Sequence, residues 1–421
     1  MELLNWPPYV TIPCSVLAIM LGMLHVMPKQ KKYVNESIKP LGFKKFQKQY
    51  VIVFWLVMFA DWLQGPNMYT LYKSYGMDVG KLFMIGFLSS ALSSCFVGQL
   101  VEKWGPKQAC LIYCLLEVMI NSMEHFPNFK LLVLSRILGG ISTALLSLSF
   151  ESWMINEHRR RQFPEELLGS TFALASEGSG IAAIIAGIVA QIGADKYGDI
   201  APFQLAIIVT VLAAFFIAQW PNNYEKSLDN KTKSLSTSCD SGSLSHAMKI
   251  GFAYSIFEGA MYNFVFMWVP LLQQAASGPV PTGLIFSCFM LCIAIGGKLF
   301  GALCFIPTVT VAMIIAAISS ITLAIPAWCP SLLSTFMTFL AYEMCIGVFI
   351  PCSAVLRATY FSPLHFNTLV AMFRLPTNLL VLGGMLLVDS IDMTRLLGAC
   401  AVLLCVSALF LSQVKSKLNL N

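Results

Sequence analysis

Two arginines lie inside long apolar segments of this chain. Arg136 sits near the start of the almost uncharged stretch 134–153, and Arg374 lies within the apolar segment 365–388. A permanent charge in a membrane span is costly unless it meets water, a ligand or a partner. A guanidinium also presents a planar fork of donors that suits tetrahedral oxyanions. We therefore predict that Arg136 and Arg374 clamp an anionic substrate.

Acidic residues accompany the arginines in other apolar segments. Asp61 and Glu258 each lie about eleven residues into their spans. Carrying an anion into a negatively charged cell costs about 2.3 kcal/mol per charge per 100 mV. Coupling to protons would offset this cost, so Asp61 and Glu258 are the candidate proton sites. Ion pairing or helix capping is the alternative role for both.

The arginines also have a purely structural interpretation. Arg136 precedes Gly140 by four residues, as Glu343 precedes Gly347, and Glu177 and Arg374 each precede a glycine by ten. This alignment of the two halves suggests buried ion pairs, Arg136 with Glu177 and Arg374 with Glu343. Such pairs are a common way to satisfy charge inside a membrane.

Two uncharged polar residues complete the predicted substrate site. Tyr69 follows Gly65 and Pro66, a pair that can break a helix and free backbone groups toward a cavity. Asn263 lies in a later span and could donate to an oxyanion. Aromatic residues near span ends more often belong to the interfacial belt, which is the alternative for Tyr69.

The composition is that of an integral membrane protein. Hydrophobic residues make up 57% of the 421 residues and charged residues only 11%. The net charge of +6 does not indicate nucleic acid, because the basic residues lie in short loops between apolar segments. The 13 cysteines are scattered through apolar segments and are interpreted as small hydrophobic residues. No motif indicates an enzyme, a metal site or a cofactor.

Thirteen apolar segments predict an all-α membrane protein. Residues 7–28 form an extra N-terminal helix, followed by a Lys-rich cytosolic loop that ends at residue 49. Six spans occupy 50–220, a polar Ser-rich linker occupies 221–247, and six more spans occupy 248–421 with a short tail. The twelve core spans are expected at 50–72, 78–99, 107–124, 131–151, 169–191, 201–220, 248–271, 281–303, 306–325, 331–351, 365–388 and 394–414.

The distribution of basic residues predicts the orientation. Most of the 27 Lys and Arg residues, Arg357 among them, fall in the loops on one side if the linker is cytosolic. The C-terminus is then cytosolic and the N-terminus lies outside.

One loop resembles a signature of the major facilitator superfamily. The stretch from Gly98 to Lys107 carries a glycine, the acid Glu102, the base Lys103, a second glycine and the base Lys107. In the superfamily such charges form a conformational latch with an acid at the end of the fourth core helix, where this chain has Glu151. Arg136 with Gly139 and Gly140 also resembles the superfamily's fourth helix. The resemblance implies two six-helix halves around a central cavity. Pro106 departs from the signature.

A narrower resemblance covers roughly residues 45–390. Its blocks are DWLQGP at 61–66, SFESW at 149–153, APF at 201–203, FMWVP at 266–270, GLIFSCFM at 283–290 and FRLP at 373–376. These blocks, in this order, are similar to the eukaryotic molybdate-anion transporter family. The resemblance implies uptake of molybdate across the plasma membrane by alternating access.

Two rival functions remain at this stage. The first is transport of a different anion, sulfate or an organic anion, which the arginines do not distinguish from molybdate. The second is a non-transporting receptor or scaffold with the same fold, although a scaffold has no reason to keep charges in its spans. The expected partners are molybdate and the lipid bilayer, and the protein is expected to be a monomer.

Overall fold

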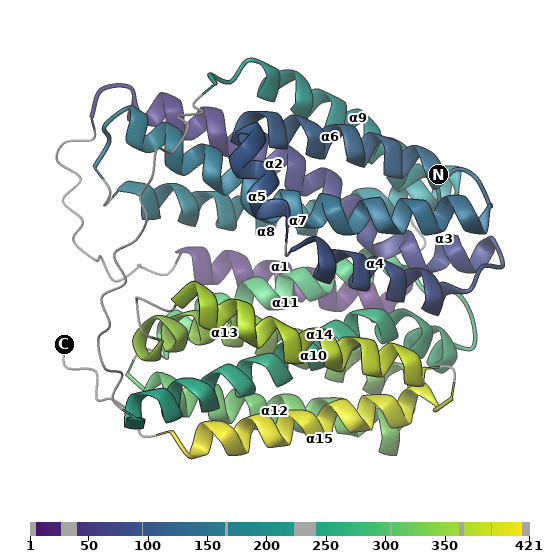
Figure 1. Cartoon of the computed structure of the whole chain (residues 1–421). Coiled ribbons are helices and arrows are strands. Elements are labelled where there is room, and N and C mark those ends of the chain that lie inside the picture. Colours follow the sequence, from purple (N-terminus) through teal and green to yellow (C-terminus); the bar gives the residue numbers. More distant parts are fainter. Residues whose placement is uncertain are drawn as a thin grey trace. The chain divides into compact units, whose positions relative to one another are not determined.

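The computed structural model describes residues 6–26, 40–94, 96–164, 167–222, 241–303, 305–361, 366–388 and 390–414. All regular structure in these ranges is helical (Figure 1). The linker residues 223–240 and most of the Lys-rich loop lie outside the described residues. Each expected span overlaps at least one helix, so the prediction of an all-α fold is confirmed.

The helices before the linker are α1 (Pro8–Val26), α2 (Phe43–Gln64), the short 3-10 turn η1 (Gly65–Asn67), α3 (Met68–Ser74), α4 (Val79–Ser93), α5 (Val97–Trp104), α6 (Pro106–Met123), α7 (Phe129–Arg160), α8 (Leu168–Tyr197) and α9 (Ala201–Ala218). Those after it are α10 (Ser241–Ala276), α11 (Thr282–Ala302), α12 (Thr308–Trp328), α13 (Leu332–Tyr360), α14 (Phe366–Leu387) and α15 (Met393–Ser412).

Nine of the described helices are long and apolar enough to span a membrane, or ten if the bent pair α4 and α5 counts as one span. Within the described residues, the apolar parts of α1 and α14 are shorter. The segment 78–99, predicted as one span, is therefore two helices that meet at an angle of 57°. The predicted break at Gly65 and Pro66 is present, because η1 separates α2 from α3 there.

The contacts divide the chain into two compact units. One contains Met27–Lys231 with Thr282–Ser287, and the other contains Met1–Val26, Thr232–Pro281 and Cys288–Asn421. The extra helix α1 thus belongs with the later half of the chain, where the Tyr9 ring meets Phe336 edge-on at 6.2 Å. The domain boundaries drawn from the sequence stay a prediction.

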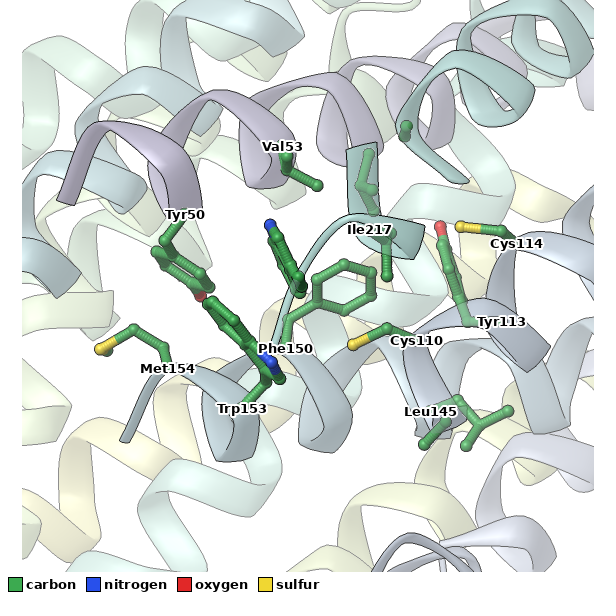
Figure 2. Close-up of a cluster of buried hydrophobic side chains, with 14 of the residues drawn as sticks. Tyr50, Val53, Cys110, Tyr113, Cys114, Leu145, Phe150, Trp153, Met154 and Ile217 are labelled. Carbon is green, nitrogen blue, oxygen red and sulfur yellow. The ribbon is translucent and has the colours of Figure 1, made fainter. Parts of the chain in front are cut away.

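In the unit that contains Met27–Lys231, α2 packs on α8 and α9, and α7 packs on α4 and α6. An aromatic cluster joins the ends of α2, α7 and α9 (Figure 2). Trp153 stacks on Trp220 at 3.8 Å between ring centroids, and Tyr50 stacks on Trp153 at 6.4 Å. The Trp153 indole donates to the Pro221 carbonyl at 3.2 Å, so the chain just after α9 is held to α7.

In the other unit, α10 packs on α13, α14 and α15, and α12 packs on α13 and α15. Helices α11 and α13 cross at two glycines. A Cβ on Gly347 would overlap the Ile293 backbone, and one on Gly296 would overlap the Met344 carbonyl oxygen. This backbone contact requires small residues, as in other helix pairs inside membranes.

Helix α4 begins at an N-cap whose effect depends on pH. The Asp78 side chain accepts from the Lys81 amide at 3.0 Å and lies 2.8 Å from the Lys81 ammonium. The Lys81 side chain and amide both lower the pKa of Asp78. The carboxylate therefore contributes stability at pH values above its unfolded pKa, about 4, and this contribution is lost as the pH falls through the lower folded pKa.

We expect Asp78→Ala to destabilise the protein by about 1 kcal/mol at pH 7, because the cap is lost. Asp78→Asn keeps a capping oxygen without the charge, so its stability should lie between that of wild type and that of Asp78→Ala. Thermal unfolding in detergent between pH 7 and pH 3 checks this. The difference between wild type and Asp78→Asn should narrow as the pH falls toward 3, and a constant difference would contradict the assignment.

Candidate functional site

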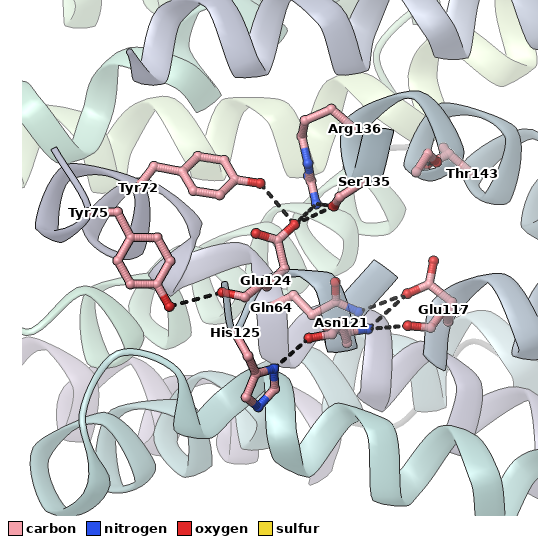
Figure 3. A network of polar contacts seen from close by, with 11 residues as sticks. Gln64, Tyr72, Tyr75, Glu117, Asn121, Glu124, His125, Ser135, Arg136 and Thr143 are labelled. Atoms are coloured by element: carbon pink, nitrogen blue, oxygen red, sulfur yellow. Dashed lines mark hydrogen bonds and ion pairs between the residues drawn. The ribbon is translucent and has the colours of Figure 1, made fainter. Parts of the chain in front are cut away.

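Arg136 lies in a buried polar cluster between α3, α6 and α7 (Figure 3). Its Nη2 donates to Oε1 of Glu124 at 2.6 Å, and the Arg136 and Glu124 side chains are 14% and 0% exposed. The same oxygen accepts from the Tyr72 hydroxyl at 3.0 Å and the Ser135 hydroxyl at 2.5 Å. The Arg136 guanidinium also lies 5.6 Å from the centroid of the Tyr72 ring.

This ion pair is incomplete on both sides. The Nε of Arg136 and the Oε2 of Glu124 are both buried and have no hydrogen-bond partner among the described residues. Only Nη2 of Arg136 bonds within that part of the chain. Because buried charged groups are costly to leave unpaired, the free side of the guanidinium is suited to bind an anion.

A second carboxylate lies further along α6. Glu117 accepts from the Ser142 hydroxyl at 2.5 Å, from the Gln64 amide at 3.0 Å and from the Asn121 amide at 3.3 Å (Figure 3 labels all but the serine). These donors come from α7, α2 and α6, so Glu117 ties three helices together. Asp61 is close enough to Glu117 for an electrostatic interaction between the two carboxyl groups.

The two clusters repeat along the pair α6 and α7. Ser142 donates to Glu117, and Ser135 donates to Glu124. The two carboxylates are seven residues apart in the chain, and so are the two serines, in the reverse order. The facing residues of α6 and α7 therefore repeat every seven residues in an antiparallel register. One further step in this register corresponds to Cys110 and Ser149, both of which are buried, but the Ser149 hydroxyl has no hydrogen-bond partner among the described residues. Seven residues are about two helical turns, which keeps these groups on one face.

The structure corrects the predicted ion pairs. Arg136 pairs with Glu124 and not with Glu177, which is exposed on α8. Arg374 is exposed on α14 and Glu343 is buried on α13, and no ion pair joins them within the described residues. The internal alignment failed because it compared positions along the sequence, whereas pairing depends on which helices are neighbours.

Glu258 has a polar setting of its own on α10. The Tyr254 hydroxyl donates to its Oε1 at 2.7 Å, and the Thr377 hydroxyl of α14 donates to its Oε2 at 3.3 Å. Tyr262, one turn further along α10, is close enough to both Glu258 and Arg374 to feel their charges. The structure thus brings Glu258 and Arg374 into one region of the later half.

The remaining predicted residues are placed as follows. Asn263 donates to the carbonyls of Gly259 at 3.0 Å and Leu380 at 3.1 Å, so its amide nitrogen holds α10 to α14. Its carboxamide also fills the space beside Gly384. Tyr69 is half-buried on α3, with the Lys73 ammonium 5.7 Å from its ring centroid.

Of the predicted latch residues, Glu102 and Lys103 lie at the end of α5 and Lys107 at the start of α6, whereas Glu151 lies within α7, which continues to Arg160. Glu102, Lys103 and Glu151 are exposed. Lys107 donates to the Ala218 carbonyl at 2.9 Å, which caps the C-terminal end of α9. A cation is favourable there, because the last carbonyls of a helix carry partial negative charge. The latch itself stays a prediction.

Sequence reasoning missed Glu124 and left Glu117 out of the predicted site. The signal was present, because Glu117, Asn121 and Glu124 follow the spacing i, i+4 and i+7 in an apolar segment. Ser135 and Ser142 repeat at seven residues on the next helix. A polar stripe on one face of each of two consecutive spans predicts that these faces meet.

Comparison with known proteins extends the similarity over most of the chain. Residues 9–347 match the major facilitator family described as sugar transporters with 12 TM. The molybdate-anion transporter of Danio rerio is 30% identical over 82% of this chain and 79% of its own length. That of Takifugu rubripes is 29% identical over 88% and 85%. The chain belongs to the molybdate-anion transporter family of the major facilitator superfamily. The resemblance noted in the sequence is thereby confirmed.

Solved structures support the same fold for this member of the molybdate-anion transporter family. The nucleoside transporter NupG aligns with a TM-score of 0.67 at 13% identity and covers 88% of this chain and 100% of its own. The human organic anion transporter TETRAN aligns with a TM-score of 0.63 at 15% identity, over 89% and 100%. At these identities the likeness concerns the fold, and the major facilitator fold is confirmed.

Proposed function

We propose that this chain carries molybdate across the membrane by alternating access, acting as a secondary transporter and not as an enzyme. The observation that carries the proposal is the buried Arg136, whose guanidinium spends one nitrogen on Glu124 and keeps Nε unpaired among the described residues. Membership in the molybdate-anion transporter family supports molybdate as the anion.

Arg136 is the anion-binding group of the first half. Tyr72, Ser135 and Glu124 fix the orientation of its Nη2. The guanidinium keeps its charge throughout transport, because its pKa is far above any physiological pH. Molybdate binds on the side of Nε and Nη1, where a tetrahedral dianion accepts two hydrogen bonds from one planar fork.

Arg374 is the anion-binding group of the second half. It is exposed, and it makes neither an ion pair nor a hydrogen bond with any residue in the described ranges. An uncompensated cation inside a helix of a membrane protein requires water or an anion nearby. Tyr69 and Asn263 contribute secondary contacts, with the Asn263 side chain also holding α10 to α14.

Exchanging Arg374 for lysine is expected to raise the KM for molybdate roughly tenfold, because a point charge replaces a planar fork. Folding should be unaffected, because the wild-type side chain is exposed and unpaired in the described part of the chain. Uptake of labelled molybdate into proteoliposomes measures this, with protein abundance as the control. An unchanged KM would remove Arg374 from the substrate site.

Protons drive the cycle in this proposal, with Asp61 and Glu258 as the exchanging groups and Glu343 and Glu177 as further carboxylates of the spans. Asp61 lies near the charge of Glu117, and Glu258 holds two hydroxyl donors that a proton would displace. Uptake into liposomes with and without an imposed pH gradient tests the coupling. If the pH gradient does not change the uptake of molybdate, the proposal of transport stands and the proposal of proton coupling fails.

The same liposomes test the proposed function itself. Purified protein should accumulate labelled molybdate, and excess sulfate should compete weakly if the site is selective. Strong competition by sulfate would indicate a general oxyanion carrier. No uptake of either anion would favour a receptor or scaffold. The plasma membrane location, the cytosolic C-terminus, the monomeric state and the latch of Glu102, Lys103, Lys107 and Glu151 belong to this proposal as well.

A further inference from the structure

A second arginine of the later half has no role in the proposal above. Arg357 was expected in a cytosolic loop, but it lies in the last turn of α13, which runs to Tyr360. Its side chain is half-buried, and its Nε is buried without a hydrogen-bond partner among the described residues. Within those residues it also makes no ion pair. Its charge is therefore not neutralised by any described carboxylate in direct contact.

What holds Arg357 is the face of an aromatic ring. Its guanidinium lies 4.1 Å from the centroid of the Tyr254 ring. At this distance the ring attracts the cation and orients the guanidinium plane, while Nε keeps no partner among the described residues. The Tyr254 hydroxyl is already used, because it donates to Glu258 at 2.7 Å.

The two arginines of the later half are linked through α10. Tyr254, Glu258 and Tyr262 follow one another at intervals of one turn. Arg357 lies at Tyr254, and Arg374 lies on α14 one turn before Thr377, whose hydroxyl donates to Glu258. Eight residues of helix separate the two tyrosines, which is about 12 Å along the axis. Glu258 lies between the two cations and is exposed only in part.

We propose that Arg357, held by Tyr254, is a second oxyanion-binding site, which takes the anion from the region of Arg374 before release on the side of the membrane where α10 begins. This inference rests on the proposed function. The ligand class is a tetrahedral oxyanion, because the guanidinium of Arg357 is a planar fork of donors whose Nε has no partner among the described residues, as in Arg136. Glu258 repels the anion between the two positions and so separates binding from release.

The competing explanation is structural. A cation in the last turn of a helix interacts favourably with the helix dipole, and its packing on Tyr254 would join α13 to α10. Such a role predicts a loss of folded protein when the charge is removed, without a change in anion affinity. The two explanations therefore differ in what they predict for binding.

Equilibrium binding of molybdate to the detergent-purified full chain is the first measurement, because it does not depend on transport. Arg357→Gln should weaken binding roughly tenfold, and Arg357→Lys, which keeps the charge, should weaken it less. Tyr254→Phe keeps the ring face and should resemble wild type more closely than Tyr254→Leu. Arg395→Gln is the matched control, because Arg395 is exposed at the start of α15 and contacts none of these residues.

The second measurement is the KM for molybdate on each face, from uptake by cells and by inside-out vesicles. In the proposed orientation α10 begins at the cytosolic face. Arg357→Gln should therefore raise the KM for molybdate roughly tenfold on the cytosolic face and less than about twofold on the opposite face. Equal changes of KM on both faces would contradict the proposed site. Unchanged molybdate binding by folded Arg357→Gln protein would contradict it as well. If wild type binds molybdate without transporting it, and Arg357→Gln weakens that binding, then the proposed function fails while the site stands. Absence of binding in wild type would overturn both.

Discussion

Replacing Arg136 with glutamine is expected to lower molybdate uptake by about a hundredfold. The guanidinium is the proposed contact of the anion, and a hydrogen bond to a charged group contributes about 1.5–3 kcal/mol, or roughly ten- to a hundredfold in affinity. The change also leaves Glu124 as a buried charge without its cation, which destabilises the fold by about 3–5 kcal/mol. Uptake and thermal stability must therefore be measured together.

A double variant separates the two effects. Arg136→Gln with Glu124→Gln removes both charges, and the amides can still accept and donate hydrogen bonds to Tyr72 and Ser135. We expect the double variant to regain most of the lost stability and to recover no uptake. Arg395→Gln is the control, since Arg395 is exposed at the start of α15 and makes no ion pair among the described residues. A double variant with wild-type KM would show that Arg136 is only structural.

Gly347→Ala is expected to cause a large loss of folded protein. The new Cβ would overlap the backbone of Ile293, which cannot move aside as a flexible side chain could. Overpacking costs about 1–3 kcal/mol in ordinary cores, and a backbone-to-backbone contact lies at the upper end of that range. Size-exclusion profiles and melting temperatures in detergent measure the effect.

Gly297→Ala is the matched control for this change. Gly297 lies beside Gly296 on the facing helix, but its Cβ would be 3.8 Å from the Gly347 carbonyl oxygen, an ordinary contact. Alanine is also the better helix former by about 1 kcal/mol. We expect this variant to be as stable as wild type or more so. Equal losses at both positions would show that the crossing of α11 and α13 is not as close as described.

The helices could be predicted because each apolar run is long enough to span a membrane and is bounded by polar loops. The residues at which the helices end were harder to predict. Helix α13 was expected to stop at residue 351 but runs to Tyr360, because Pro351 is tolerated inside it. Prolines are accepted in membrane helices when neighbouring helices and side chains satisfy the freed backbone groups. This extension is what moved Arg357 from a loop into a helix.

The site was predictable in its charges and not in its partners. Arg136 stood out because a lone arginine is costly in an apolar segment. Its partner Glu124 lies just beyond the end of α6, and nothing in the sequence alone connects it with Arg136. Only the packing of α3 on α6 and α7 shows that this carboxylate is fully buried with Tyr72, Ser135 and Arg136 around it. Charge alone does not specify such neighbours.

The matched spacing of Glu117 with Ser142 and Glu124 with Ser135 has a mechanical consequence. If α7 slid along α6 by one turn, both carboxylates would lose a hydroxyl donor at the same time. Each buried charged group left unsatisfied costs more than about 1–3 kcal/mol, so intermediate positions of the slide are strongly disfavoured. Helices α6 and α7 are therefore expected to move together as a rigid pair. The conformational change of transport should tilt this pair as a unit and should not slide one helix along the other.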